Sequence, residues 1–250
     1  MTIARALELA RLTVLELEAV EASTAPSAPI APATPAKPPA TPPAVTAGLT
    51  NPSAFFDVLR ASKVLGPTLE PGEVSGCEAI LSACAGKMPT SWTAYALATA
   101  FLETAGTMQP ISEYGGNAYF HRMYDIQGAR PAKAKELGNT SPGDGVKFHG
   151  RGYVQLTGKT NYERAGRELG FDLVGDPDLA KRLDVAAAVM VRGMIEGWFT
   201  GKGLRAFIPN EPTLQNFTAA RRIINGQDRA ADVAGYAMTF LKALQAGGWR

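Results

Sequence analysis

Two carboxylates ten positions apart could carry acid–base chemistry. Glu103 ends the apolar run Ala-Thr-Ala-Phe-Leu-Glu, and Glu113 lies in Gln-Pro-Ile-Ser-Glu-Tyr-Gly-Gly. A helix C-terminus carries partial negative charge and apolar neighbours disfavour a carboxylate, so both effects favour the protonated form of Glu103. A protonated acid facing an ionised base is the pair that glycosidic hydrolysis needs. The simpler interpretation is two solvated glutamates.

A third segment, Gly-Arg-Gly-Tyr-Val-Gln-Leu-Thr, ends at Thr157. Residues 153–157 predict a short strand, whose alternation places Val154 and Leu156 on one face and, on the other, Tyr153, Gln155 and Thr157. The second face offers a ring, an amide and a hydroxyl, which suit sugar recognition or holding a water. An ordinary half-buried strand is the alternative.

Other ligand chemistries find little support. Gly158-Lys-Thr160 resembles the end of a phosphate-binding loop, but five residues instead of four separate it from Gly152. Cys77 and Cys84 lie two helical turns apart, roughly 10 Å, which is too far for a disulfide and predicts two buried thiols. With two histidines in the chain, we expect no metal and no organic cofactor.

Composition places the chain among soluble globular proteins. Of its 250 residues 46% are hydrophobic and 19% charged, and the net charge of +2 is too small to predict nucleic-acid binding. No apolar run reaches about 18 residues, so we expect no stable membrane insertion. Glu8, Glu16 and Glu18 interrupt the N-terminal stretch, so it predicts no secretory signal and synthesis in the cytoplasm.

Three regions are predicted along the chain. Residues 1–22 carry apolar side chains at three-four spacing, which predicts an amphipathic helix that could self-associate or dock on a partner, or merely fray in isolation. Residues 23–47 are rich in Pro and Ala and predict a semi-rigid linker. Residues 48–250 form the predicted catalytic domain.

The catalytic domain is predicted to be mainly α with a small β element. Gly115 to Gly145 is rich in Gly and Pro and is interpreted as a long loop. The periodic segments that predict helices are 51–65, 73–85, 91–102, 161–169, 177–182, 186–199, 214–224 and 228–246.

The order of these segments from about Gly76 to Leu244 resembles glycoside hydrolase family 19, and more narrowly the endolysins of bacteriophages and prophages. Tyr-Ala-Leu-Ala-Thr-Ala-Phe-Leu-Glu-Thr-Ala resembles the stretch that holds the catalytic acid, which puts that role on Glu103. Thr-Met-Gln-Pro-Ile-Ser-Glu-Tyr-Gly resembles the endolysin segment that holds the second carboxylate, Glu113. Residues 149–162 resemble the family's most recognisable signature.

The resemblance also assigns the remaining site residues. Thr157 matches the position that holds the attacking water, and the positions expected to contact substrate are Arg151, Tyr153, Gln155, Asn161 and Asn225. Two departures stand out. Leu102 replaces the histidine that usually precedes the catalytic glutamate. The family's later basic residue has no clear match, with Arg229 as a stand-in.

The family implies a lysozyme-like fold of two helical lobes with a groove and a small β element beside it, and hydrolysis with inversion. The endolysin resemblance implies peptidoglycan as the polymer, reached through a holin-type pore or another delivery route. Chitin shares the β-1,4 linkage and remains an alternative substrate. A non-catalytic wall-binding or virion module is the third interpretation.

Overall fold

The structure, a computed structural model, describes residues 48–66, 68–224 and 226–250. These residues belong to one unit that runs from Ala44 to Arg250. The predicted helix over residues 1–22, the predicted linker over residues 23–47 and the expected substrate contact Asn225 lie outside the described residues, so they remain predictions.

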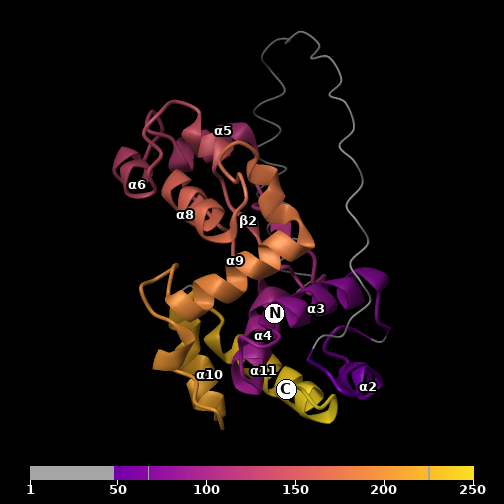
Figure 1. Cartoon of the computed structure of the whole chain (residues 1–250). Helices are drawn as coiled ribbons and strands as arrows, with labels where there is room; N and C mark the ends of the chain where they lie inside the picture. The colour runs from indigo at the N-terminus through magenta and orange to yellow at the C-terminus, as the bar shows by residue number, and fades with distance from the viewer. Residues whose placement is uncertain (1–47, 67, 225) are drawn as a thin grey trace. The chain divides into compact units, whose positions relative to one another are not determined.

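One group of helices surrounds the segment that carries Glu103. Helix α11 (Ala230–Ala246) contacts α2 (Pro52–Ser62), α4 (Thr90–Glu103) and α10 (Leu214–Ala220). Helix α3 (Pro71–Cys84) packs on α4 from another side. Figure 1 shows α4, in purple, next to the yellow α11. The short 3-10 turn η3 (Arg221–Ile223) continues directly from α10.

A second group carries Glu113. It contains α5 (Asn117–Tyr124), α6 (Pro131–Glu136), α7 (Asp144–Lys147) and α8 (Lys159–Leu169). Two short antiparallel strands, β1 (Ile111–Ser112) and β2 (Arg151–Gly152), pair in the register Ile111 with Gly152 and Ser112 with Arg151. The 3-10 helix η1 (Pro177–Lys181) contacts β2, and the 3-10 helix η2 (Leu204–Ala206) follows later.

Helix α9 (Leu183–Glu196) joins the two groups, because it contacts α3 in the first and α8 in the second. In Figure 1 this helix, in orange, crosses between α8 and α4. The first group and the second therefore share one continuous core, which holds the two segments that carry the glutamates on a common frame.

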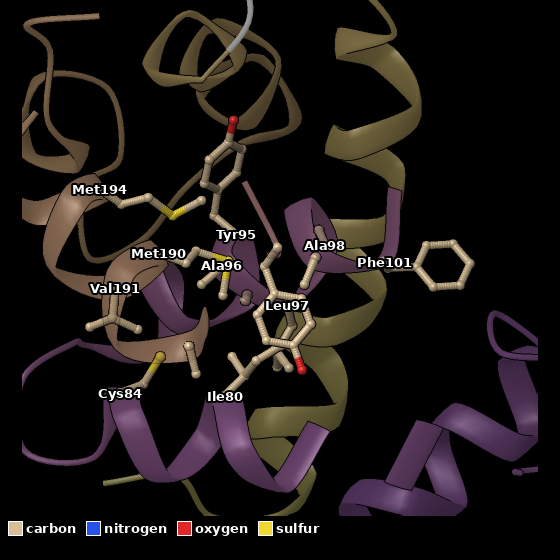
Figure 2. Packing of buried hydrophobic residues seen from close by; sticks show 14 of the residues in the cluster. Ile80, Cys84, Tyr95, Ala96, Leu97, Ala98, Phe101, Met190, Val191 and Met194 are labelled. Carbon is tan, nitrogen blue, oxygen red and sulfur yellow. The ribbon is translucent and has the colours of Figure 1, made fainter. Parts of the chain in front are cut away.

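The centre of this core is α4, which is buried on all sides. Every residue from Ser91 to Phe101 except Trp92 is buried, as expected for a helix that is apolar around its whole circumference. Figure 2 shows its alanines between Ile80 and Cys84 of α3 and the methionines Met190 and Met194 of α9. Small residues on α4 allow the neighbouring helices to approach closely. This packing holds the end of α4, and therefore Glu103, in a fixed position.

Local signals explain the ends of several helices. Asn51 caps α2, since its side chain accepts a hydrogen bond from Ala54 N at 3.2 Å. Gly170 follows α8 with φ +75°, in the left-handed region that favours glycine. Gly76 lies where α3 meets the loop before β1, and an added Cβ there would collide with the carbonyl oxygen of Met108.

The expected class, mainly α with a small β element, is confirmed. Two local predictions are wrong. The predicted loop over 115–145 contains α5, α6 and the start of α7. The predicted strand over residues 153–157 is a tight turn, because the strand ends at Gly152 and the chain returns to pair Leu156 with Arg151. Among the described helices, none has the length and apolar character that crossing a bilayer would require.

Candidate active site

Glu103 is the last residue of α4, as the sequence predicts, and it has a charged partner. Arg221 of η3 donates a hydrogen bond from Nη1 to Glu103 Oε1 at 2.7 Å. The Arg221 side chain is 2% exposed and that of Glu103 19% exposed. Arg221 Nε donates to the carbonyl oxygen of Asp228 at 2.8 Å. One buried guanidinium thus holds both the carboxylate and the segment before α11.

Arg221 changes the electrostatic argument made from the sequence. The helix C-terminus and apolar neighbours favour a neutral carboxyl, whereas a guanidinium favours the charged one. The bond also distinguishes the two oxygens of Glu103, because Arg221 has no acceptor and must find a lone pair on Oε1. A proton on this carboxyl therefore belongs on Oε2. Leu102, in place of the family's histidine, packs against the core and contributes no hydrogen bond.

Glu113 follows β1 and is fixed by three hydrogen bonds. Its backbone N donates to Gly150 O at 2.8 Å, and Gly150 N donates to its Oε2 at 3.1 Å. The hydroxyl of Tyr124, at the end of α5, donates to Oε1 at 2.6 Å. Hydrogen bonds to an ionised carboxylate are stronger than neutral ones, so both oxygens are oriented before substrate arrives.

Tyr124 remains a proton donor to Glu113 over the whole working pH range. Burial raises the pKa of the Tyr124 hydroxyl, and its hydrogen bond to Glu113 and the negative charge of that carboxylate raise this pKa further. Sequence reasoning missed Tyr124 because it lies in the segment interpreted as a loop. Its position at the end of a helix could have been found only by recognising α5.

Three side-chain oxygens converge around Gly150. A Cβ added at Gly150 would lie 2.9 Å from Gln155 Oε1, 3.0 Å from Glu113 Oε2 and 3.1 Å from Thr157 Oγ1. The close approach explains why glycine occupies this position. The structure therefore brings together three of the residues that the sequence predicts: the second carboxylate, the amide and the hydroxyl.

The turn over residues 153–155 orients these groups in place of the predicted strand. Gln155 has φ +51°, in the left-handed region, and its Nε2 donates to Gly152 O at 3.1 Å. Its Oε1 therefore turns towards Gly150. The hydroxyl of Thr157 donates to Gln155 O at 2.8 Å, and Asn161 Nδ2 donates to Thr157 O at 2.7 Å.

Tyr153 and Arg151, which are predicted to contact substrate, both have partners inside the protein. Tyr153 is fully buried, and its hydroxyl donates to Met108 O at 2.9 Å. Arg151 is 7% exposed and pairs through Nε with Asp178 at 2.8 Å. Its Nη1 also donates to the hydroxyl of Tyr162 at 3.0 Å. Both side chains are occupied inside the protein, so their role here is to hold the turn and β2 in place.

Arg229, the stand-in for the family's later basic residue, pairs with a residue of its own helix turn. Its Nε pairs with Asp232 at 2.9 Å, and Arg221 occupies the carboxylate of Glu103 instead. Sequence reasoning missed Arg221, although it lies in the motif Ala-Arg-Arg-Ile-Ile-Asn-Gly. The residues around Arg221 in the sequence are both polar and apolar, so they indicate neither its burial nor a partner on α4.

His149 adds a neutral imidazole next to Gly150. Its ring stacks on Phe120 with centroids 4.1 Å apart and planes 1° apart, and its Nδ1 lies 2.7 Å from Val146 O. A carbonyl oxygen only accepts, so Nδ1 carries the proton. Burial lowers the pKa of His149, so the ring is neutral near pH 7. Within the described part of the chain, no cluster of His, Cys, Asp and Glu could hold a metal ion.

The site thus consists of two clusters from the two groups of elements. Glu103 and Arg221 come from α4 and η3, whereas Glu113, Gln155 and Thr157 surround Gly150 beside β1 and β2. Each cluster contains one carboxylate, and at least one of its oxygens accepts a hydrogen bond from a neighbouring group. Carboxylates held in this way can each donate or accept a proton.

Comparison with known proteins gives a family match. The family model described as "Chitinase class I" matches residues 86–239, more than half of the chain. Chitinase 8 of Oryza sativa subsp. japonica is 39% identical over 90 residues, which cover 36% of this chain and 31% of that protein. The acidic endochitinase of Petunia hybrida is 31% identical over 134 residues, covering 53% and 42%.

The chain therefore spans well under half the length of these two relatives. Among solved structures, chitinase C from Streptomyces griseus HUT6037 aligns with a TM-score of 0.49 and 19% identity, over 81% of this chain and 78% of that one.

Proposed function

The chain belongs to glycoside hydrolase family 19, and from this premise we propose that it hydrolyses β-1,4 bonds in a polymer of N-acetylated amino sugars. The observation that carries the proposal is the pair of differently held carboxylates. Arg221 occupies one oxygen of Glu103, and Tyr124 and Gly150 hold both oxygens of Glu113. We propose peptidoglycan as the polymer.

In the proposed mechanism Glu103 is the general acid. Its Oε2 carries the proton and delivers it to the glycosidic oxygen as the bond to the anomeric carbon breaks. The carboxylate that remains is stabilised by the hydrogen bond from Arg221 Nη1, which strengthens as negative charge develops. Arg221 is thus a positioning residue that favours the product state of the proton transfer.

Glu113 is the proposed general base. It takes a proton from a water that attacks the anomeric carbon from the face opposite to Glu103, and the hydroxyl of Thr157 and the amide of Gln155 orient that water. Tyr124 and Gly150 N hold Glu113 in its ionised, accepting form. A single displacement inverts the anomeric configuration, and such pairs stand roughly 6.5–9.5 Å apart to leave room for the water.

The peptidoglycan proposal rests on the endolysin-like wording around Glu113 and on the mild positive charge of the chain, +2, which favours an anionic polymer. In this role the protein would be made in a bacterial cytoplasm and reach the wall after holin-type release or another delivery. Wall degradation from within would then lyse the host.

The first test is loss of turbidity of outer-membrane-permeabilised Gram-negative cells. We compare the wild type with Glu103→Gln, and with Glu211→Gln as a control that changes an exposed glutamate elsewhere. Lysis by wild type and control that falls by 10²-fold or more in Glu103→Gln, with circular dichroism showing that this variant is folded at the assay temperature, supports the proposal. Equal lysis by all three would move the acid elsewhere. Loss in Glu211→Gln as well would point to a folding defect.

Chitin is a second candidate, favoured by the two plant relatives, a chitinase and an acidic endochitinase. Soluble chitin oligomers are a direct assay for it, and NMR of the first products tests inversion for either polymer. An initial excess of α-anomer is expected from a β-linked substrate. Hydrolysis of chitin oligomers without lysis of cells would assign chitin and overturn the peptidoglycan proposal.

A further inference from the structure

A pocket with a mixed polar and apolar lining lies next to Arg221, the residue that holds Glu103. It has a volume of about 600 Å³, and its polar lining consists of Gln215, Thr218, Arg222, Gln227, Arg229 and Asp232. These residues come from α10, η3, the segment before α11 and the first turn of α11. None of them belongs to the two clusters described above.

The pocket carries a positive charge that is not balanced from within. Its single acid, Asp232, pairs with Arg229 at 2.9 Å. Arg222 is half-buried, and no carboxylate of the described residues forms an ion pair with it. Its backbone is anchored by Thr200, whose hydroxyl donates to Arg222 O at 2.7 Å. Two amides add neutral donors to one available guanidinium, a set that suits a carboxylate, whereas the hydroxyl of Thr218 already donates to Leu214 O at 2.9 Å.

The pocket is connected to the catalytic carboxylate through one residue. Arg221, next to Arg222 in the chain, donates to Glu103 Oε1 and to Asp228 O. Asp228 lies between Gln227 and Arg229, which both line the pocket. The guanidinium that positions Glu103 therefore also fixes one wall of the pocket.

We propose that this pocket binds a carboxylate carried by a substituent of the polysaccharide. This inference rests on the proposed function and narrows its substrate class. Chitin is a neutral polymer without carboxylates, whereas peptidoglycan carries them on its lactyl groups and peptide stems. In peptidoglycan the lactyl carboxyl is amide-bonded wherever a peptide stem is attached, so its free carboxylates lie on the stems and on the lactyl groups that carry no stem. A pocket that binds such a carboxylate next to Arg221 would align peptidoglycan strands and gain nothing from chitin.

The test measures binding to the full chain by isothermal titration or NMR, with N-acetylmuramic acid and muramyl dipeptide as probes. The first carries its carboxylate on the lactyl group and the second on the peptide, so the two arms separate the sources. Neither contains a glycosidic bond between sugars, so neither is turned over. Neutral chitobiose is the control probe. Arg222→Gln removes the available charge, and Arg205→Gln removes an exposed arginine outside the pocket.

We expect at least one acidic probe to bind wild type and Arg205→Gln equally, and Arg222→Gln at least tenfold more weakly, as for a lost charge-assisted bond. The proposal that the pocket binds a carboxylate is overturned if both variants bind the probes equally, or if the wild type binds neither acidic probe. If binding depends on Arg222 but the protein lyses no cells, the pocket binds carboxylates and the peptidoglycan proposal is refuted. If the protein lyses cells but binding does not depend on Arg222, the peptidoglycan proposal stands and the pocket proposal is refuted.

Discussion

Arg221 and Glu103 lie 118 positions apart in the chain, and a 2.7 Å hydrogen bond joins them in the folded protein. Because Arg221 is almost fully buried, Arg221→Gln leaves a poorly hydrated carboxylate without its cation. We expect the free energy of unfolding to fall by about 3 kcal/mol, as when one partner of a buried pair is removed. Denaturant titration and initial rates of hydrolysis measure the two effects.

Arg221→Lys separates charge from geometry. Lysine keeps the positive charge but offers one ammonium group in place of a planar fork that reaches both Glu103 and Asp228 O. An intermediate loss of stability and rate is therefore expected, with Arg205→Gln unchanged as the surface control. A wild-type rate in Arg221→Gln would remove Arg221 from the mechanism.

Tyr124→Phe tests whether the 2.6 Å hydrogen bond to Glu113 matters for catalysis. The variant keeps the ring and loses the donor, so one oxygen of Glu113 is no longer held in place. We expect the rate to fall roughly tenfold. Tyr236→Phe, on α11, is the matched control. A wild-type rate in Tyr124→Phe would remove this hydrogen bond from the mechanism.

Gly150→Ala should damage catalysis more than stability. Its Cβ would lie about 3 Å from three oxygens, those of Gln155, Glu113 and Thr157, so at least one must move. A displacement of this size at a catalytic group lowers kcat by up to about 10²-fold. Gly235→Ala, where an added Cβ meets nothing within 4 Å, should be neutral or slightly stabilising. Wild-type kcat in Gly150→Ala would show that the site tolerates the shift.

Asp125 predicts an acid-dependent loss of stability. Burial alone would raise the pKa of this carboxyl, but the backbone N–H groups of Gln127, Gly145 and Gly143 outweigh it and lower the pKa. A depressed folded-state pKa means that the stabilisation is complete above the unfolded value, about 4, and is lost as pH falls through the lower folded value. Asp125→Asn should flatten the dependence of unfolding free energy on pH in this acid range. Parallel curves for the two proteins would exclude this role.

Thr99→Val should leave the protein equally stable or stabilise it. Thr99 Oγ1 is buried on α4 without a hydrogen-bond partner, as are the hydroxyls of Ser91 and Tyr95, eight and four positions earlier. Valine has the same shape and buries no polar group, so up to about 1 kcal/mol of desolvation cost is removed. Thermal unfolding measures it. A clear destabilisation would show that the hydroxyl is bonded, for example to an internal water.

Sequence patterns predicted features that depend on near neighbours. The helix predicted over residues 161–169 is found as α8, because its apolar spacing lies within one segment. Glu103 lies at the end of α4, as the unbroken apolar run before it predicts. Glu113, Gln155 and Thr157 lie close together around Gly150, and the roles that the family resemblance assigns to them remain predictions.

Features set by tertiary contact could not be predicted in this way. The alternation of Val154 and Leu156 resembles a strand, but the left-handed conformation of Gln155 turns the chain back on itself. The glycines and prolines of residues 115–145 favour the interpretation as a loop, although this segment contains the helix that ends at Tyr124. Arg221 meets its carboxylate only after α10 and α11 have packed against the helix that carries Glu103.

The mutual bonds between Glu113 and Gly150 close the intervening chain into a loop whose two ends are locked together. Insertions or deletions in the part of this loop between α5 and α7 would change the residues around Glu113 without moving Glu113 itself. The same closure makes this stretch a natural location for lengthening or shortening by evolution. Changes there alter the substrate range while the reaction chemistry stays constant. The segment between Glu113 and Gly150 is therefore the part to replace when a different polymer is to be cleaved.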